Sequence, residues 1–295
     1  MNWDRVERLI GSRNLDLLAH KRVGIVGLGS GGGFVALSLA MSGVGRFVLI
    51  DDDTLEAANV VRHVADLREV GRPKPEAVAD LIRQRNPNAE VSTRTGRIEQ
   101  HLDALDGLDL LVVGVDGENS KYIINQACLE RRLTAVYAGV YERGEGGDVT
   151  VIHPYDGPCY ACWAAELRDE LAKPDDTGEL DYGMIGADGT LEAEPGLWLH
   201  VVRIASVQAD MALNELLKGT EIHRALPGNT VILANTSLEI ISGEISPPYS
   251  AVWATVERNP HCLVCGSPAQ EQESSLDDLM QATGIVLEEN EDKKS

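Results

Sequence analysis

The sequence of 295 residues is 43% hydrophobic and 25% charged, the composition of a globular protein with a substantial core. Its formal net charge of −21 argues against DNA or RNA as the main partner, because nucleic-acid binding relies on Lys and Arg to neutralise phosphates. Residues 1–5 show no apolar leader, and the longest weakly polar stretch, 34–45, is too short to span a bilayer. We therefore expect a cytoplasmic protein without a membrane partner.

The first predicted elements form a nucleotide-binding unit. A buried strand over 22–27 runs into a glycine-rich turn, which opens a helix over 31–42. The turn has the spacing G-x-G-x-x-G, with Gly27, Gly29 and Gly32. The first glycine permits a tight turn, the second lets the backbone approach a phosphate, and the third lets the helix pack on the strand. Asp51 ends the next strand, 19 residues after Gly32, where its carboxylate can accept both ribose hydroxyls.

Basic and polar residues follow the ribose-binding acid closely along the chain. The set consists of Asp51, Asp52, Asp53, Asn59, Arg62 and Lys74. A dehydrogenase has little use for these two cations, whereas an enzyme that splits ATP needs them to neutralise the polyphosphate, with Asn59 to orient it. Asp116 ends a later strand at the edge of the sheet where ligands bind, and its carboxylate could hold Mg²⁺. ATP and Mg²⁺ are therefore the predicted ligands.

Strands and helices alternate through the first half of the chain, which is typical of βαβ units. The predicted strands cover 22–27, 46–51, 90–93, 109–115 and 134–139, and the predicted helices cover 31–42, 73–85 and 119–131. Later come an antiparallel strand over 148–153, a helix over 196–218 and strands over 229–235 and 250–256. We expect an α/β, Rossmann-like fold with a mostly parallel sheet, helices on both faces and antiparallel C-terminal strands.

Two segments interrupt this rhythm. Residues 165–195 are rich in Asp, Glu and Gly without sustained periodicity, which predicts a mobile loop of functional length. The acidic residues 269–295 predict a flexible, solvated tail, with a short docking helix at 276–280 as the alternative.

Four of the five cysteines form two C-x-x-C pairs, Cys159 with Cys162 and Cys262 with Cys265. In a cytosolic chain such pairs favour a tetrahedral four-cysteine zinc site over redox-active or incidental motifs. Because 100 residues separate Cys162 from Cys262, this zinc clamp would join two distant segments. The fifth cysteine, Cys128, lies in a helical stretch and is predicted to be a small buried residue.

These motifs together resemble the ubiquitin-activating-enzyme superfamily, in particular its bacterial ThiF/MoeB/HesA branch. The similar elements are the nucleotide loop at 23–32, the D-x-D…N-x-x-R element at 51–62, the G-x-x-K element at 71–74, the first cysteine pair at 157–162, residues 206–209, and residues 8–11. The resemblance covers about Arg5 to Gly266, so we expect one nucleotide-binding adenylation domain over 1–268, with residues 163–195 as its crossover loop.

The resemblance implies ATP-dependent adenylation of a C-terminal carboxylate, typically the Gly-Gly end of a ubiquitin-like or sulfur-carrier protein, with release of pyrophosphate. It implies catalytic and nucleotide-binding roles for Asn59, Arg62, Lys74 and Asp116, and nucleotide binding by the glycine loop and by Asp51 and Asp53. It also implies a homodimer in which Arg8 reaches the neighbour's phosphates. Positioning and charge neutralisation would supply the catalysis.

The sequence departs from the family at three places. Residues 163–195 contain no cysteine, so we expect no thioester on this chain's own crossover loop. His63 stands where the family tends to have Gln, and Gly117 stands where it tends to have Asn. Both changes leave details of the phosphate site open.

Other functions remain open beside the leading one. The carboxylate could belong to a peptide terminus or a small molecule. An NAD(P)-dependent oxidoreductase is disfavoured by Arg62, Lys74 and the two cysteine pairs, and a non-catalytic scaffold would need neither these cations nor Asp116.

Overall fold

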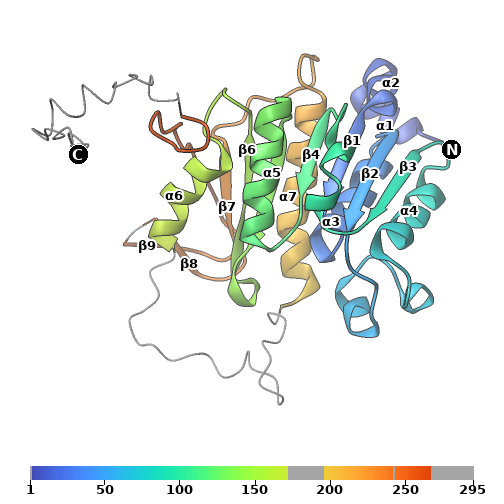
Figure 1. Cartoon of the computed structure of the whole chain (residues 1–295), viewed down its shortest axis with the longest axis horizontal. Helices are drawn as coiled ribbons and strands as arrows, with labels where there is room; N and C mark the ends of the chain where they lie inside the picture. The colour runs from blue at the N-terminus through green and yellow to red at the C-terminus, as the bar shows by residue number, and fades with distance from the viewer. Residues whose placement is uncertain (1, 172–195, 242, 267–295) are drawn as a thin grey trace, which may run out of the picture.

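A central eight-stranded sheet organises the structure, a computed structural model that describes residues 2–171, 196–241 and 243–266 (Figure 1). Its strands are β1 (Arg22–Val26), β2 (Arg46–Asp51), β3 (Glu90–Thr95), β4 (Leu110–Val113), β5 (Ala135–Val140), β6 (Gly146–Ile152), β7 (Thr230–Ala234) and β10 (Ala251–Ala254). They lie in the order β10-β7-β6-β5-β4-β1-β2-β3. From β3 to β5 all neighbours are parallel, and from β5 to β10 all are antiparallel. The mostly parallel sheet with antiparallel C-terminal strands is therefore confirmed.

Helices cover both faces of this sheet. The larger ones are α3 (Ser30–Met41), α4 (Lys74–Arg85), α5 (Glu118–Arg131), α6 (Tyr160–Leu171) and α7 (Trp198–Leu216). Short 3₁₀ turns complete the connections: η1 (Ala57–Arg62), η2 (Leu67–Glu69), η3 (Ile98–Gln100), η4 (Leu102–Leu105) and η5 (Glu142–Gly144). Helices α3, α4 and α7 pack on one face, and α5 and α6 pack on the other.

Strand β2 shows how the sequence builds this sandwich. Phe47 and Leu49 belong to the core shared with α3, α4 and α7, whereas Val48 and Ile50 belong to the core shared with α5 and α6. Successive side chains of a strand point to opposite faces, so a strand buried on both sides reads as a continuous apolar run. This explains why the parallel strands could be predicted from sequence.

Several elements differ from the sequence-based expectation. Helices α1 (Asp4–Ile10) and α2 (Ser12–His20), and the hairpin of β8 (Leu238–Ile241) and β9 (Glu244–Ser246), were not predicted. The expectation of a loop without regular structure over 165–195 is wrong at its start, because α6 extends to Leu171. Tyr160, Trp163 and Ala164 are buried at helical spacing and anchor α6 on the sheet. The rest of the predicted loop and the predicted tail at 269–295 lie outside the described residues. Within the described residues, no helix is both long and apolar enough to cross a bilayer.

Candidate nucleotide site and metal centre

A cavity of about 540 Å³ lies at the carboxyl ends of the parallel strands β1, β2 and β4. Residues that follow these strands line it, together with a turn after β3 and the first residue of α4. Of the predicted site residues, those that line the cavity are Gly27, Gly29, Asp51, Asp53, Lys74 and Asp116. This edge of a doubly wound sheet is the place where such folds bind ligands.

The glycine loop has the close approaches that its sequence predicts. Gly27 has φ of +85°, and a Cβ there would lie 2.6 Å from the carbonyl carbon and oxygen of Gly114. A Cβ on Gly32 would overlap the carbonyl oxygen of Gly27, so α3 packs directly on the loop. A Cβ on Gly29 would meet nothing within 4 Å, because that side of the loop faces the cavity. No side chain caps α3 at Gly29, so its first backbone N–H groups are available to an anion.

Asp51 is fixed by the backbone on both of its carboxylate oxygens. The N–H of Leu28 donates to Oδ2 at 2.5 Å, and the N–H of Asp53 donates to Oδ1 at 2.8 Å. Burial raises the pKa of Asp51, while these two N–H groups and the nearby ammonium of Lys74 act against the shift. Each oxygen keeps a free lone pair, so the carboxylate can still accept a hydroxyl from a ligand.

Lys74 enters the cavity from the first turn of α4. Its Nζ donates to Oδ2 of Asp53 at 2.5 Å, and its side chain is only 10% exposed, against 63% for Asp53. The backbone N–H of Lys74 also donates to the carbonyl of Asp53 at 2.9 Å. The segment after β2 is therefore tied to the start of α4. An entering phosphate would compete with Asp53 for the ammonium of Lys74.

Two further charged residues that line the cavity, Arg97 and Glu118, were not predicted from the sequence. Arg97 Nε donates to Oδ2 of Asp52 at 3.2 Å across the mouth of the cavity. Glu118, the first residue of α5, accepts the hydroxyl of Tyr160 at 3.1 Å and the ammonium of Lys121 at 3.2 Å. Lys121 is 5% exposed, so Glu118 is held over a buried cation. The signal in the sequence for Glu118 was its position two residues after Asp116, at the start of a helix.

Asn59, Arg62 and Arg8 are not among the residues that line the cavity in the described part of the chain. Asn59 and Arg62 lie on η1, in the connection between β2 and α4, and the side chain of Asn59 accepts the backbone N–H of Glu56 at 3.0 Å. Arg8 pairs with Asp4 at 3.0 Å on α1, which packs near Ser42 at the far end of α3 from the glycine loop. Arg8 therefore lies away from the cavity of its own chain.

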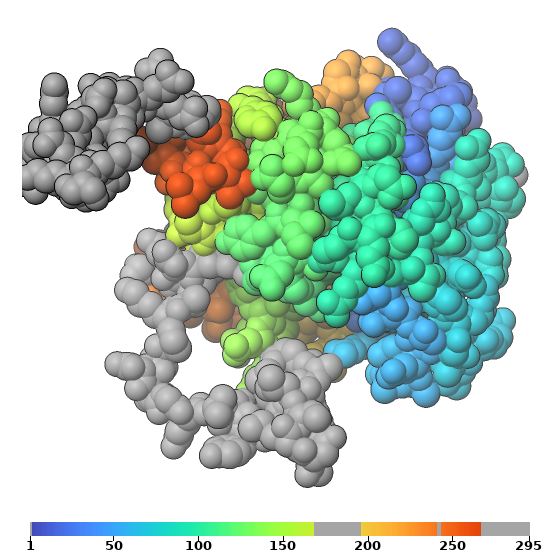
Figure 2. All heavy atoms as spheres, in the orientation of Figure 1, coloured from blue at the N-terminus to red at the C-terminus, as the bar shows by residue number. Residues whose placement is uncertain are grey.

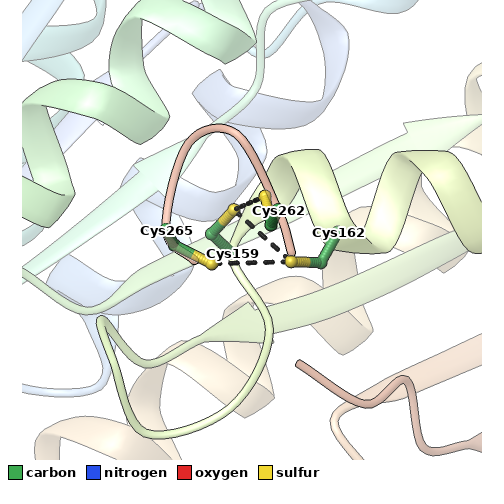
Figure 3. A group of neighbouring side chains, drawn as sticks. All are labelled: Cys159, Cys162, Cys262 and Cys265. Carbon is green, nitrogen blue, oxygen red and sulfur yellow. Dashed lines mark hydrogen bonds between the residues drawn. The ribbon is translucent and has the colours of Figure 1, made fainter. Parts of the chain in front are cut away.

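The four paired cysteines converge in space as predicted, although the chain between them is long (Figure 3). Their sulfur atoms all lie within 4.8 Å of one another, and the separations are 3.8 Å for Cys159–Cys162, 3.8 Å for Cys159–Cys262 and 3.5 Å for Cys162–Cys265. Zn–S bonds of about 2.3 Å in a tetrahedron place sulfur atoms about 3.8 Å apart. The donor set therefore fits zinc in both chemistry and geometry.

The surroundings of the cluster favour closed, structural coordination. Burial raises the pKa of both Cys159 and Cys162. Burial acts the same way on Cys262, but N–H donors from residues 264 and 265, together with hydrogen bonds from the thiols of Cys162 and Cys159, outweigh it and lower the pKa of that thiol to about 7. One of these donors, the N–H of Val264, lies 3.4 Å from the Cys262 sulfur. Residues 255–266 lie against α5 and α6 in the space-filling view, so the cluster joins the end of the described chain to these helices (Figure 2).

Cys128 is buried, as predicted. It is 2% exposed among the side chains between α5 and the sheet, and burial raises its pKa to about 12. A nucleophilic cysteine needs access and a thiolate, so Cys128 cannot supply a thioester from this position.

Known proteins resemble this chain in sequence along most of its length. The chain matches the ThiF family over residues 4–285. It is 28% identical over 271 residues to the SAMP-activating enzyme E1 of Haloferax volcanii, covering 91% of this chain and 88% of that protein. It is 31% identical over 188 residues to the adenylyltransferase and sulfurtransferase UBA4 of Yarrowia lipolytica, covering 62% of this chain and 47% of that protein.

The fold is also found among solved structures. E. coli MccB in complex with ATP has a TM-score of 0.67 and 22% sequence identity, with 90% of this chain and 75% of that chain covered. This likeness concerns the fold, while the family match over nearly the whole sequence concerns ancestry and chemistry. The chain therefore belongs to the ThiF family, the adenylyltransferases related to the enzymes that activate ubiquitin-like proteins.

Proposed function

We propose that this enzyme adenylates the C-terminal carboxylate of a small ubiquitin-like or sulfur-carrier protein that ends in Gly-Gly. The observation that carries the proposal is the cavity that combines the glycine loop, the ribose-binding Asp51, the buried ammonium of Lys74 and Asp116. The substrate class is supported by the SAMP-activating enzyme E1, which matches along most of both chains.

In the proposed reaction, the carboxylate oxygen attacks the α-phosphorus of ATP. The bond from that phosphorus to the bridging oxygen breaks, and pyrophosphate leaves with the electron pair. The glycine loop and the start of α3 would receive the phosphates through backbone N–H groups, and Asp51 would hold the ribose. Lys74, Arg62 and Asn59 would neutralise and orient the phosphates. No protein nucleophile or base is needed.

The cofactors follow from the donor sets. Asp116 would hold Mg²⁺, which lowers the charge repulsion between the phosphates and the incoming carboxylate. The cluster of Cys159, Cys162, Cys262 and Cys265 would hold a structural zinc ion and take no part in the chemistry. We further propose a cytoplasmic homodimer in which Arg8 of each protomer completes the phosphate site of its partner.

The acyl-adenylate would be consumed without a thioester on residues 163–195, because that stretch has no cysteine. Denaturing gels of the enzyme with its carrier should therefore show no reducible adduct to this segment. A thiol-sensitive adduct mapped to residues 163–195 would contradict that part of the proposal.

ATP–pyrophosphate exchange tests the function directly. The assay uses labelled pyrophosphate and Mg²⁺, with and without ubiquitin-fold proteins from the same genome that end in Gly-Gly. Exchange that depends on one of them, and is lost when its last glycine is deleted, is the expected result. Binding of ATP without exchange for any such protein would shift the substrate to another carboxylate, such as a peptide terminus.

A further inference from the structure

His63 lies directly behind the glycine loop and is only 6% exposed. Its Nε2 lies 2.8 Å from the carbonyl oxygen of Leu28, and its Nδ1 lies 3.0 Å from the backbone nitrogen of Ala65. A backbone N–H can only donate, so Nδ1 accepts and carries no proton. The remaining proton therefore lies on Nε2, which donates to Leu28. Both hydrogen bonds require the neutral ring with this one tautomer.

Leu28 is the residue between the first two glycines of the loop. Its carbonyl accepts from His63, and its N–H donates to Oδ2 of Asp51 at 2.5 Å. The imidazole lies beside the helix that starts from this loop, because a Cβ added to Gly33 would lie 3.6 Å from its Nε2. One side chain is thus hydrogen-bonded to the loop backbone and lies next to the first turn of α3.

We propose that His63 is a positioning residue that holds the phosphate-binding loop in its shape as a neutral imidazole, and that its protonation loosens the loop and weakens nucleotide binding. The second half rests on the proposed function, since it takes ATP as the ligand. A proton on Nδ1 would face the N–H of Ala65, so the ring would have to turn and release Leu28. The Leu28 carbonyl would then lose the donor that fixes the loop from behind.

The surroundings of His63 oppose protonation. Burial lowers the pKa of His63 most, and the ammonium of Lys74 from α4 lowers it further, while the hydrogen bond to Leu28 and the carboxylate of Asp51 from β2 act in the opposite direction. The positively charged Arg62 precedes it in η1, and the first turn of α3 offers no ionisable side chain. Together these effects lower the pKa of His63.

The sign of the pH effect follows from this shift. The unfolded chain binds a proton at His63 near the ordinary histidine pKa of about 6.5, and the folded chain binds it only at lower pH. The contribution of His63 to the free energy of unfolding is therefore complete at neutral pH. This contribution is lost as the pH falls from neutral through the pKa that His63 has in the folded protein. Nucleotide binding should weaken over the lower part of the same range.

Two substitutions separate the hydrogen bonds from the charge. His63→Gln can keep both, with its amide NH₂ donating to Leu28 and its oxygen accepting from Ala65, but it cannot be protonated. His63→Leu fills the space and removes both bonds. His20→Gln is the matched control, because His20 lies exposed on α2.

The test measures ATP binding by calorimetry from about pH 8 to pH 5.5, a range that brackets the ordinary histidine pKa. We expect a steeper loss of affinity on acidification for the wild type and His20→Gln than for His63→Gln, a comparison that cancels the titration of ATP itself. At neutral pH, His63→Leu should bind ATP roughly fivefold more weakly, the size of one net hydrogen bond, and His63→Gln should recover most of this loss.

Equal pH slopes in the wild type and His63→Gln would overturn the proposal, as would wild-type affinity in His63→Leu. Thermal unfolding across the same pH range supplies a readout that needs no ligand. If no variant bound ATP at any pH, the proposed function would fail. The loop-holding role would then stand or fall on whether His63→Gln removes the acid-side loss of stability.

Discussion

Lys74→Ala removes a cation that the structure places in the nucleotide cavity. The ammonium is nearly buried and pairs with the largely exposed Asp53 at 2.5 Å. When polyphosphate enters, Asp53 can be solvated by water at little cost, whereas the ammonium has little access to solvent. We therefore expect Lys74 to exchange its carboxylate partner for the phosphates and to remain beside them through the reaction.

The magnitude follows from this exchange of partners. Two unit charges about 4 Å apart interact by about 4 kcal/mol at the effective dielectric constant of about 20 that suits such sites. Part of the attraction between Lys74 and the phosphates only replaces the ion pair with Asp53 that is lost. The catalytic part is the growth of charge on the departing pyrophosphate, and loss of one such donor lowers rates by about 10²–10³-fold. Lys74→Ala should lower pyrophosphate exchange by about that factor.

The assay is carrier-dependent ATP–pyrophosphate exchange, with circular dichroism to verify the fold. Lys21→Ala is the matched control, because Lys21 also forms an ion pair, with Asp109 at 3.0 Å, but lies at the amino end of β1. Lys74→Arg keeps the charge and should retain part of the rate. Unchanged exchange in a folded Lys74→Ala protein would refute the assignment of this ammonium to the leaving pyrophosphate.

Three other pairs of substitutions test the remaining parts of the site. Cys262→Ser with Cys265→Ser should lower both zinc content and melting temperature, because a closed four-cysteine site contributes directly to folding energy; wild-type protein that contains no zinc by metal analysis would contradict this. Gly32→Ala should destabilise the fold in thermal unfolding, since its Cβ would overlap the carbonyl of Gly27, whereas Gly29→Ala should spare stability; equal melting temperatures would count against the packing argument. Tyr160→Phe keeps the ring contacts but removes the hydroxyl that donates to Glu118, so KM for ATP should rise roughly fivefold, the value of one hydrogen bond, while Tyr122→Phe should not change it.

The parallel half of the sheet could be predicted because its signals are local. Strands such as β2 are buried on both faces and read as apolar runs, and Gly27 and Gly32 are required by close backbone approaches that any residue with a Cβ would violate. The cysteine cluster was predictable for a different reason. The spacing within each C-x-x-C pair fixes two ligands at once, so the pairs could be matched although the chain between them is long.

The elements that were not predicted depend on contacts that no local pattern records. The start of α6 is helical because Tyr160 stacks on Tyr137 at 4.7 Å and on Trp163 at 5.4 Å between centroids, and because its N–H donates to the side chain of Asn125. In the sequence, the acidic and glycine-rich residues that follow hide this short apolar turn. Tertiary packing decides the structure here over local propensity.

The charges around the cavity show where prediction from sequence ends. The sequence indicates that Asn59, Arg62, Lys74 and Arg8 act on a polyphosphate, but only Lys74 lines the cavity in the described structure. Lys74 is fixed there by the backbone of α4 and by Asp53, so its place needs no ligand. Arg8 lies on α1 near the opposite end of α3, so the role proposed for it depends on the proposed second protomer. A long cationic side chain is flexible and takes its functional position when its anion is present. The sequence can therefore predict the chemistry of such residues, whereas the fold without the anion does not fix their positions.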